Sequence, residues 1–194
     1  MNIIREARPE DTSAILDIYA PFILHSRTSF EREVPSVASF QQRISSIQEQ
    51  YPWLVYVVDE TIAGYAYGSL HRKRHAYQWS TEVSAYVHGD FRRKGIAAAL
   101  YHSLFACLRL QGYFTAFAGI TLPNEASEKF HKHLGFKEIG MYENVGFKMG
   151  EWVGTLWLSK PIQNAYHKPS DIVSLASLRG THSWENALAS GIGG

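Results

Sequence analysis

The sequence predicts one mixed α/β domain, residues 1–162, whose helices cover both faces of a mostly antiparallel sheet. Segments with strand-like alternation and segments with helical spacing of apolar residues follow one another in the order β-α-α-β-β-β-α-β-α-β-β. Three successive strands joined by short turns favour antiparallel pairing, whereas helical crossovers permit parallel neighbours. With 194 residues, of which 45% are hydrophobic, the chain can bury one substantial core.

The N-terminal half combines two helices with two strands that follow them. Acidic residues after Pro9 favour the dipole of the first helix, and apolar residues spaced by three or four continue the second. Gly64 and Gly68 would weaken their strand unless another segment packs closely against its backbone. The predicted elements are, in order, a strand at 2–7, helices beginning near Pro9 and Val37, and strands at 53–58 and 61–69.

A fourth strand, Glu82–Val87, leads through a short loop into a long helix that ends at Gly112. Its alternation predicts two faces, with Val83, Ala85 and Val87 on one and Glu82, Ser84 and Tyr86 on the other. The loop carries two arginines, a lysine and a glycine at 92–95. A helix N-terminus exposes unpaired N–H groups, and these favour a phosphate or diphosphate.

The loop matches neither the G-x-G-x-x-G fingerprint of dinucleotide folds nor the P-loop pattern. Its cations oppose the helix dipole, and an anionic ligand would remove that conflict. An ordinary basic surface turn before an amphipathic helix is the alternative. The local pattern gives the two interpretations about equal weight.

The C-terminal part predicts a further strand, a helix and two last strands, followed by a tail. The tail, residues 163–194, is rich in Ser, Gly, Asn and His, so we expect it to be flexible or to hold one short helix. The predicted elements are a strand at 114–120, a helix at about 124–134, and strands at 136–142 and 150–159, with Gly146–Lys148 as a turn.

Composition excludes several classes of function. The net charge of +1 gives no support for electrostatic nucleic-acid binding, and one cysteine, Cys107, cannot form an intrachain disulfide. The charged N-terminus does not resemble a signal peptide, and no apolar run approaches the roughly 20 residues that span a bilayer. We therefore expect a cytoplasmic protein with neither membrane nor nucleic-acid partners.

The loop also fits the pattern [Q/R]-x-x-G-x-[G/A], as Arg92, Gly95 and Ala97, directly after a strand. This resembles the diphosphate-binding motif of the GCN5-related N-acetyltransferases (GNAT), which bind acetyl-CoA and share the element order above. Further motifs look like the phosphinothricin and methionine-sulfoximine acetyltransferases of that superfamily. They are Tyr51–Val55, Arg74–Tyr77, Leu122–Asn124, His131, Leu134–Phe136 and Gly146–Trp152. Gly154 departs from the group, which usually has an acidic residue there.

The resemblance implies a role for each matching residue. Glu82 would accept the proton of the amine, directly or through water, and His131 would protonate the departing thiolate. Without the resemblance, Glu82 is a solvated carboxylate, Asn124 a helix N-cap and His131 a core histidine. The coenzyme would be bound by the strand residues Ala85, Tyr86 and Val87, by Asn124, and by the loop and helix residues Arg92, Arg93, Lys94, Gly95, Ile96, Ala97 and Ala98.

The resemblance also implies the acceptor, a small compound like phosphinothricin, methionine sulfoximine or methionine sulfone. Arg74 and Tyr77 would bind its anionic groups, and Phe30 would form an aromatic wall or, equally well, a core position. The group often forms homodimers, which would place Phe147 and Trp152 at an interface. His131 and His133 lack the spacing of helical metal ligands, so we expect no metal. Acetylation of a polyamine or a protein N-terminus, or CoA binding without turnover, are the alternatives.

Overall fold

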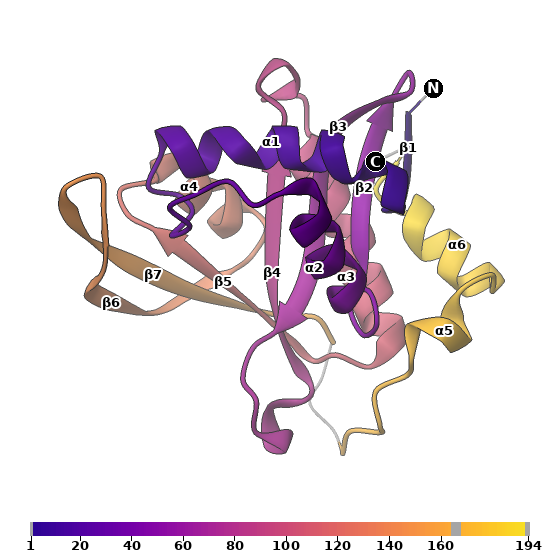
Figure 1. The fold of residues 1–194 in the computed structure, drawn as a ribbon. Helices are drawn as coiled ribbons and strands as arrows, with labels where there is room; N and C mark the ends of the chain where they lie inside the picture. Colours follow the sequence, from indigo (N-terminus) through magenta and orange to yellow (C-terminus); the bar gives the residue numbers. More distant parts are fainter. Residues whose placement is uncertain (1, 164–167, 193–194) are drawn as a thin grey trace.

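The computed structural model describes residues 2–163 and 168–192, and its mixed α/β class agrees with the sequence prediction (Figure 1). One 7-stranded sheet has the order β1-β2-β3-β4-β5-β7-β6. Its strands are β1 (Asn2–Glu6), β2 (Trp53–Val58), β3 (Thr61–Leu70), β4 (Ser80–Val87), β5 (Thr115–Thr121), β6 (Lys137–Lys148) and β7 (Glu151–Pro161). The α-helices are α1 (Thr12–His25), α2 (Val37–Ile47), α3 (Ile96–Gln111), α4 (Glu125–His133), α5 (Leu175–Leu178) and α6 (His182–Ala189), and 3-10 turns lie at Pro9–Asp11, His75–Tyr77 and Gly89–Phe91.

The sheet divides into two halves at β4 and β5, its one parallel pair. These strands pair at only three positions, the last being Glu82 with Phe117. Beyond this point β4 stays paired with β3 as far as Val87, while β5 stays paired with β7 as far as Thr121. The two halves therefore separate along the second part of both strands.

Helices cover both faces, with α1 and α2 on one side and α3 on the other (Figure 1). Val83 lies in the core under α3, whereas Tyr86 packs toward α1, as the alternation of β4 predicts. The predicted close approach at the two glycines of β3 is also present. A Cβ on Gly64 would lie 3.2 Å from the Ile96 side chain, and one on Gly68 would lie 3.3 Å from Leu108.

The last two strands form a longer hairpin than the sequence predicts. The turn expected at Gly146–Lys148 is wrong, because these residues pair with Glu151–Val153 and the chain reverses at Met149 and Gly150, both with positive φ. Gly146 is needed for another reason: an added Cβ would lie 2.7 Å from the Phe30 ring. Figure 1 shows β6 and β7 extending away from the helices.

The C-terminal segment is not the flexible tail or single short helix that its composition predicts. Residues 168–192 contain both α5 and α6, and Leu175, Trp184 and Leu188 are buried in the core beside α3. Predictions for residues 164–167 and 193–194 lie outside the described residues. The domain boundary at 162 stays a prediction.

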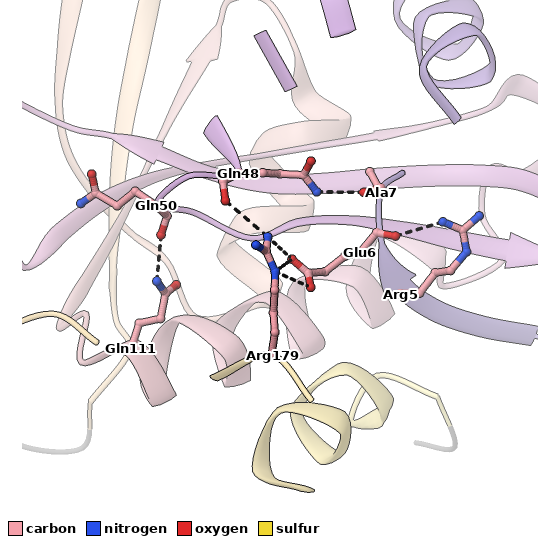
Figure 2. Close-up of polar contacts among 7 residues, drawn as sticks. All are labelled: Arg5, Glu6, Ala7, Gln48, Gln50, Gln111 and Arg179. Atoms are coloured by element: carbon pink, nitrogen blue, oxygen red, sulfur yellow. Dashed lines mark hydrogen bonds and ion pairs between the residues drawn. The ribbon is translucent and has the colours of Figure 1, made fainter. Parts of the chain in front are cut away.

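Polar contacts attach this segment to β1, to the end of α2 and to α3, and Figure 2 shows those made by Arg179. The Arg179 guanidinium donates to the Glu6 carboxylate at 2.8 Å and to the Gln48 carbonyl. On the helix side, the Ser103 hydroxyl donates to the Leu188 carbonyl at 2.7 Å and accepts from the Gly191 N–H at 3.0 Å. The segment is therefore held by hydrogen bonds as well as by apolar contacts.

None of the described helices combines the length and apolarity required to cross a bilayer.

Replacing Trp184 with alanine should lower the free energy of unfolding by about 3–5 kcal/mol. The Trp184 side chain is only 1% exposed, so its removal leaves a cavity in the core. Urea denaturation followed by circular dichroism measures this change. Leu24→Ala is the matched control, since Leu24 is 53% exposed on α1 and should change stability little. Equal effects of the two substitutions would show that the segment does not belong to the cooperative fold.

Candidate active site

A cavity of about 650 Å³ lies where the two halves of the sheet separate. Val83 to Tyr86 of β4 form one wall and Ala118 to Thr121 of β5 form the other. Its remaining lining comes from the C-terminal half of α1 and the loop after it, from the loop before α3 and the start of that helix, and from α4 with its N-cap. It includes Pro21, Phe22, His25, Thr28, Arg92, Ala97, Tyr101, Asn124, Ser127, Phe130 and His131.

The N-terminus of α3 opens at this cavity. Gly95 is the N-cap residue, with φ of 78°, and no side chain caps the helix. A Cβ at Gly95 would meet no atom within 4 Å, so the approach to its backbone is open. The first N–H groups of a helix lack intrahelical partners, and the helix dipole adds positive charge there. Arg92, Arg93 and Lys94 lie exposed in the preceding loop, so this end of the cavity suits a diphosphate.

The edge of β4 offers a second binding element. Because β4 and β5 are not paired beyond Glu82, the backbone of β4 faces the cavity along Ala85 and Tyr86. An extended ligand can add to such an edge with main-chain hydrogen bonds. Val87 continues the same strand but is not among the residues that line the cavity in the described chain.

A second cavity of about 590 Å³ adjoins the first on the face of the sheet that carries Glu82. The two cavities share six lining residues, so the walls of one continue into the other. The shared residues are Thr28, Val83, Ser84, Tyr86, Gly119 and Thr121. The second cavity is otherwise lined by Glu82 and by hydroxyl, aromatic and acidic side chains, among them Tyr19, Ser29, Phe30, Glu31, Tyr142 and Trp157.

Glu82 has one carboxylate oxygen bound by a histidine that the sequence analysis did not single out. Glu82 Oε1 lies 3.1 Å from His71 Nδ1, and the carboxylate side chain is 33% exposed. Burial raises the pKa of the Glu82 carboxyl above its ordinary value, while the hydrogen bond from His71 and the charge of Arg72 act in the opposite direction. In the sequence, His71 looks like part of a basic surface loop.

His131 is buried against the first cavity with both ring nitrogens engaged. Nδ1 lies 2.8 Å from the Ser127 carbonyl, which can only accept, so Nδ1 carries the hydrogen. Nε2 lies 3.2 Å from the Tyr101 hydroxyl. Burial lowers the pKa of His131, so the neutral ring predominates at pH 7.

Asn124 is the N-cap of α4, and its position at the cavity is compatible with the coenzyme contact predicted for it. Its side chain accepts a hydrogen bond from the Ser127 N–H at 3.2 Å, which makes it the N-cap of α4, and it also lines the first cavity. An N-cap bond uses only the amide oxygen, so the NH₂ group stays available to a ligand.

The residues predicted to bind the acceptor are only partly brought together. Phe30 lies in the wall of the second cavity, with its ring against Gly146. Arg74 and Tyr77 are exposed in the β3–β4 loop and are not among the described residues that line the cavity, although Tyr77 contacts the His71 ring. Arg72 comes closer, with Nη2 3.3 Å from the Tyr142 hydroxyl. The substrate roles of Phe30, Arg74 and Tyr77 stay predictions.

The family and the known proteins that this chain resembles are all acetyltransferases. Residues 4–157 match the acetyltransferase (GNAT) domain family. The chain is 34% identical to phosphinothricin N-acetyltransferase of Streptomyces viridochromogenes, over 77% of this chain and 81% of that protein. It is 31% identical to L-methionine sulfoximine/L-methionine sulfone acetyltransferase of Pseudomonas aeruginosa, over 77% of this chain and 88% of that protein.

A solved structure extends the match to the fold. This chain is similar in structure, with a TM-score of 0.83 and 31% identity, to a GNAT superfamily phosphinothricin acetyltransferase from Sinorhizobium meliloti in complex with AcCoA. The alignment covers 87% of this chain and 93% of that one. The chain therefore belongs to the GNAT family of N-acetyltransferases, enzymes that take the acetyl group from acetyl-CoA.

Proposed function

We propose that this enzyme acetylates the α-amino group of a small amino-acid-like compound of the phosphinothricin, methionine sulfoximine or methionine sulfone type. The observation that carries the proposal is the pair of adjoining cavities over the separated strands β4 and β5. The first cavity has the diphosphate-binding end of α3, and the second has Glu82. The thioester would lie where the two cavities meet, beside Ser84 and Tyr86.

Glu82 acts as the base in this proposal. The amine attacks the thioester carbonyl as its C–N bond forms, and its proton passes to the Glu82 carboxylate, directly or through one water. A backbone N–H of β4 near Ala85 stabilises the oxyanion that develops on the carbonyl. Attack occurs directly from the bound amine, since Cys107 is buried in the core and cannot carry an acyl group.

His131 acts at the other end of the reaction. In its protonated form it gives a proton to the thiolate that leaves as the C–S bond breaks, and the ring becomes neutral. The Tyr101 hydroxyl, 3.2 Å from Nε2, fixes the orientation of the ring. Because burial lowers the pKa of His131, this route weakens as pH rises above the acidic range.

A small anionic acceptor fits the second cavity because Arg72 reaches it. The guanidinium bonds to Tyr142 at the cavity wall and can pair with a carboxylate there. The acidic residue of the same wall, Glu31, is already paired with Arg43 at 2.6 Å. Detoxification of amino-acid analogues in the cytoplasm is the physiological role we expect for such an enzyme.

The decisive experiment measures CoA thiol release from acetyl-CoA with phosphinothricin, methionine sulfoximine, methionine sulfone, free amino acids and polyamines. We expect turnover with the first three, and Glu82→Gln should lower kcat/KM near pH 7 by about 10²–10⁴-fold because the base is lost. Binding of acetyl-CoA by calorimetry should not change in this variant. Turnover with polyamines alone would overturn the acceptor class, and full activity of Glu82→Gln would overturn the base.

The diphosphate position can be tested with a charge that leaves the helix intact. Ala97→Asp places a carboxylate in the first turn of α3, where it favours the helix dipole but repels a diphosphate. We expect the Kd for acetyl-CoA to rise by roughly tenfold to a hundredfold. Ala97→Asn is the neutral control of the same size. Equal affinities of the two variants would place the diphosphate elsewhere.

We also propose that two copies pair through the β6–β7 hairpin. Seven large apolar side chains on it are between 48% and 64% exposed, more than a monomer normally leaves in one region. A hairpin that pairs with its own copy makes the self-complementary contact of a two-fold dimer. The exposed residues are Ile139, Met141, Tyr142, Val145, Phe147, Met149 and Trp152.

Sedimentation velocity tests the dimer. The wild-type protein should sediment as a dimer, and Trp152→Glu should convert it to a monomer because the ring is 64% exposed in a single copy and would be buried in the pair. Val37→Glu is the control, since Val37 is 46% exposed on α2, away from the hairpin. A monomeric wild type at micromolar concentration would contradict the proposal.

A further inference from the structure

His71 reaches Glu82 because of its place in the sheet. It is the first residue after β3 and lies two residues beyond Ser69, the pairing partner of Glu82. Side chains two residues apart on a strand point to the same face, and diagonal neighbours on antiparallel strands are within reach. The contact of 3.1 Å between Nδ1 and Oε1 follows from this register.

Aromatic neighbours fix the orientation of the His71 ring. It stacks on Phe117 with a centroid distance of 4.1 Å and an interplanar angle of 4°. Phe117 itself pairs with Glu82 at the last position where β4 and β5 are joined. The rings of Tyr77 and Trp157 make T-shaped contacts with it at centroid distances of 6.1 and 6.2 Å, and the His71 side chain is only 11% exposed. The ring therefore has little freedom to turn away from the carboxylate.

We propose that His71 is a positioning residue for Glu82, whose Nδ1–H holds Oε1 so that the second carboxylate oxygen is presented to the acceptor cavity in its ionised form. An ionised carboxylate only accepts, so Nδ1 must carry the hydrogen. The inference rests on the proposed function of Glu82 as the base. Burial of Glu82 acts against the charged carboxylate, and the bond from Nδ1–H acts in its favour.

The ionisation of Glu82 depends on several groups around it. The His71 bond and the Arg72 charge favour the carboxylate, and burial opposes them. The other titratable groups on the same face come from α1, the α1–α2 loop, β3 and β6, and are Tyr19, Glu31, Tyr67 and Tyr142. Within the described residues, His71 bonds to the carboxylate, whereas Arg72 acts on it through its charge.

Two substitutions distinguish the contribution of the aromatic ring of His71 from that of its hydrogen-bond donor. His71→Phe keeps an aromatic ring to stack on Phe117 but removes the donor. His71→Asn removes the ring but keeps an amide N–H₂ near the position of Nδ1. Circular dichroism and acetyl-CoA binding should match the wild type for both, because the first cavity does not include residue 71.

Loss of the donor raises the pKa of Glu82, so the base becomes ionised only at higher pH. For His71→Phe we expect the acid limb of the kcat/KM profile to move up by roughly one pH unit and kcat near pH 6 to fall by about tenfold. The KM for acetyl-CoA should stay the same. His71→Asn should restore most of the wild-type profile, which a role in packing alone would not produce.

A second measurement does not need activity. In protein labelled with ¹³C-glutamate, the carboxyl signal absent from Glu82→Gln is followed against pH, and His71→Phe should shift its titration upward by roughly one unit. An unshifted titration together with an unchanged acid limb would overturn the role of His71, even if Glu82→Gln is inactive. If no amine is acetylated by the wild type, the proposed function fails, and the NMR titration alone then decides whether His71 controls Glu82.

Discussion

The site depends on one constraint, the separation of β4 from β5 after three paired positions. Each strand keeps its outer partner to the end, so the sheet stays continuous on both sides of the opening. Inside the opening, backbone groups that a regular sheet would pair are left for a ligand or water. The same separation creates a cavity that reaches through the sheet, from the α3 N-terminus on one face to Glu82 on the other.

The α1–α2 loop, residues 26–36, links the two halves, because it bonds to α1, which packs on the first half, and to β6 of the second. On the first half, the Tyr19 hydroxyl lies 2.7 Å from Ser29 Oγ, and its ring packs against Tyr86 of β4. On the second half, buried Lys148 donates to the Ser29 carbonyl at 2.6 Å, and burial lowers the pKa of this lysine. An ammonium with this partner is costly to displace, so the loop acts as a fixed wall between the cavities.

Local patterns in the sequence predicted the parts of the fold that local physics determines. The alternation of β4 gave its two faces, and the glycines of β3 indicated the close approach of α3. Other features depend on partners distant in sequence. Gly146 resembles a turn residue, but its lack of a side chain makes room for Phe30, and His71 resembles a surface cation until its register with Glu82 is known. Trp184 is a weak signal in a polar segment, and only its contacts with α3 show that it belongs to the core.

The C-terminal segment lies beyond the family match, which ends at 157, yet it contacts the helix that binds the coenzyme in our proposal. A Cβ on Gly191 would lie 2.0 Å from the Ala99 carbonyl oxygen, so the chain passes directly against the first turn of α3. The Ala99 N–H in turn bonds to the Gly95 carbonyl, which closes that turn at the N-cap. The end of α3 at which we propose the diphosphate binds is thus supported by α6 and the residues that follow it, while the first N–H groups of the helix face the cavity. Because the support comes from the opposite side of the helix, it can fix the position of those groups without occupying any part of the site.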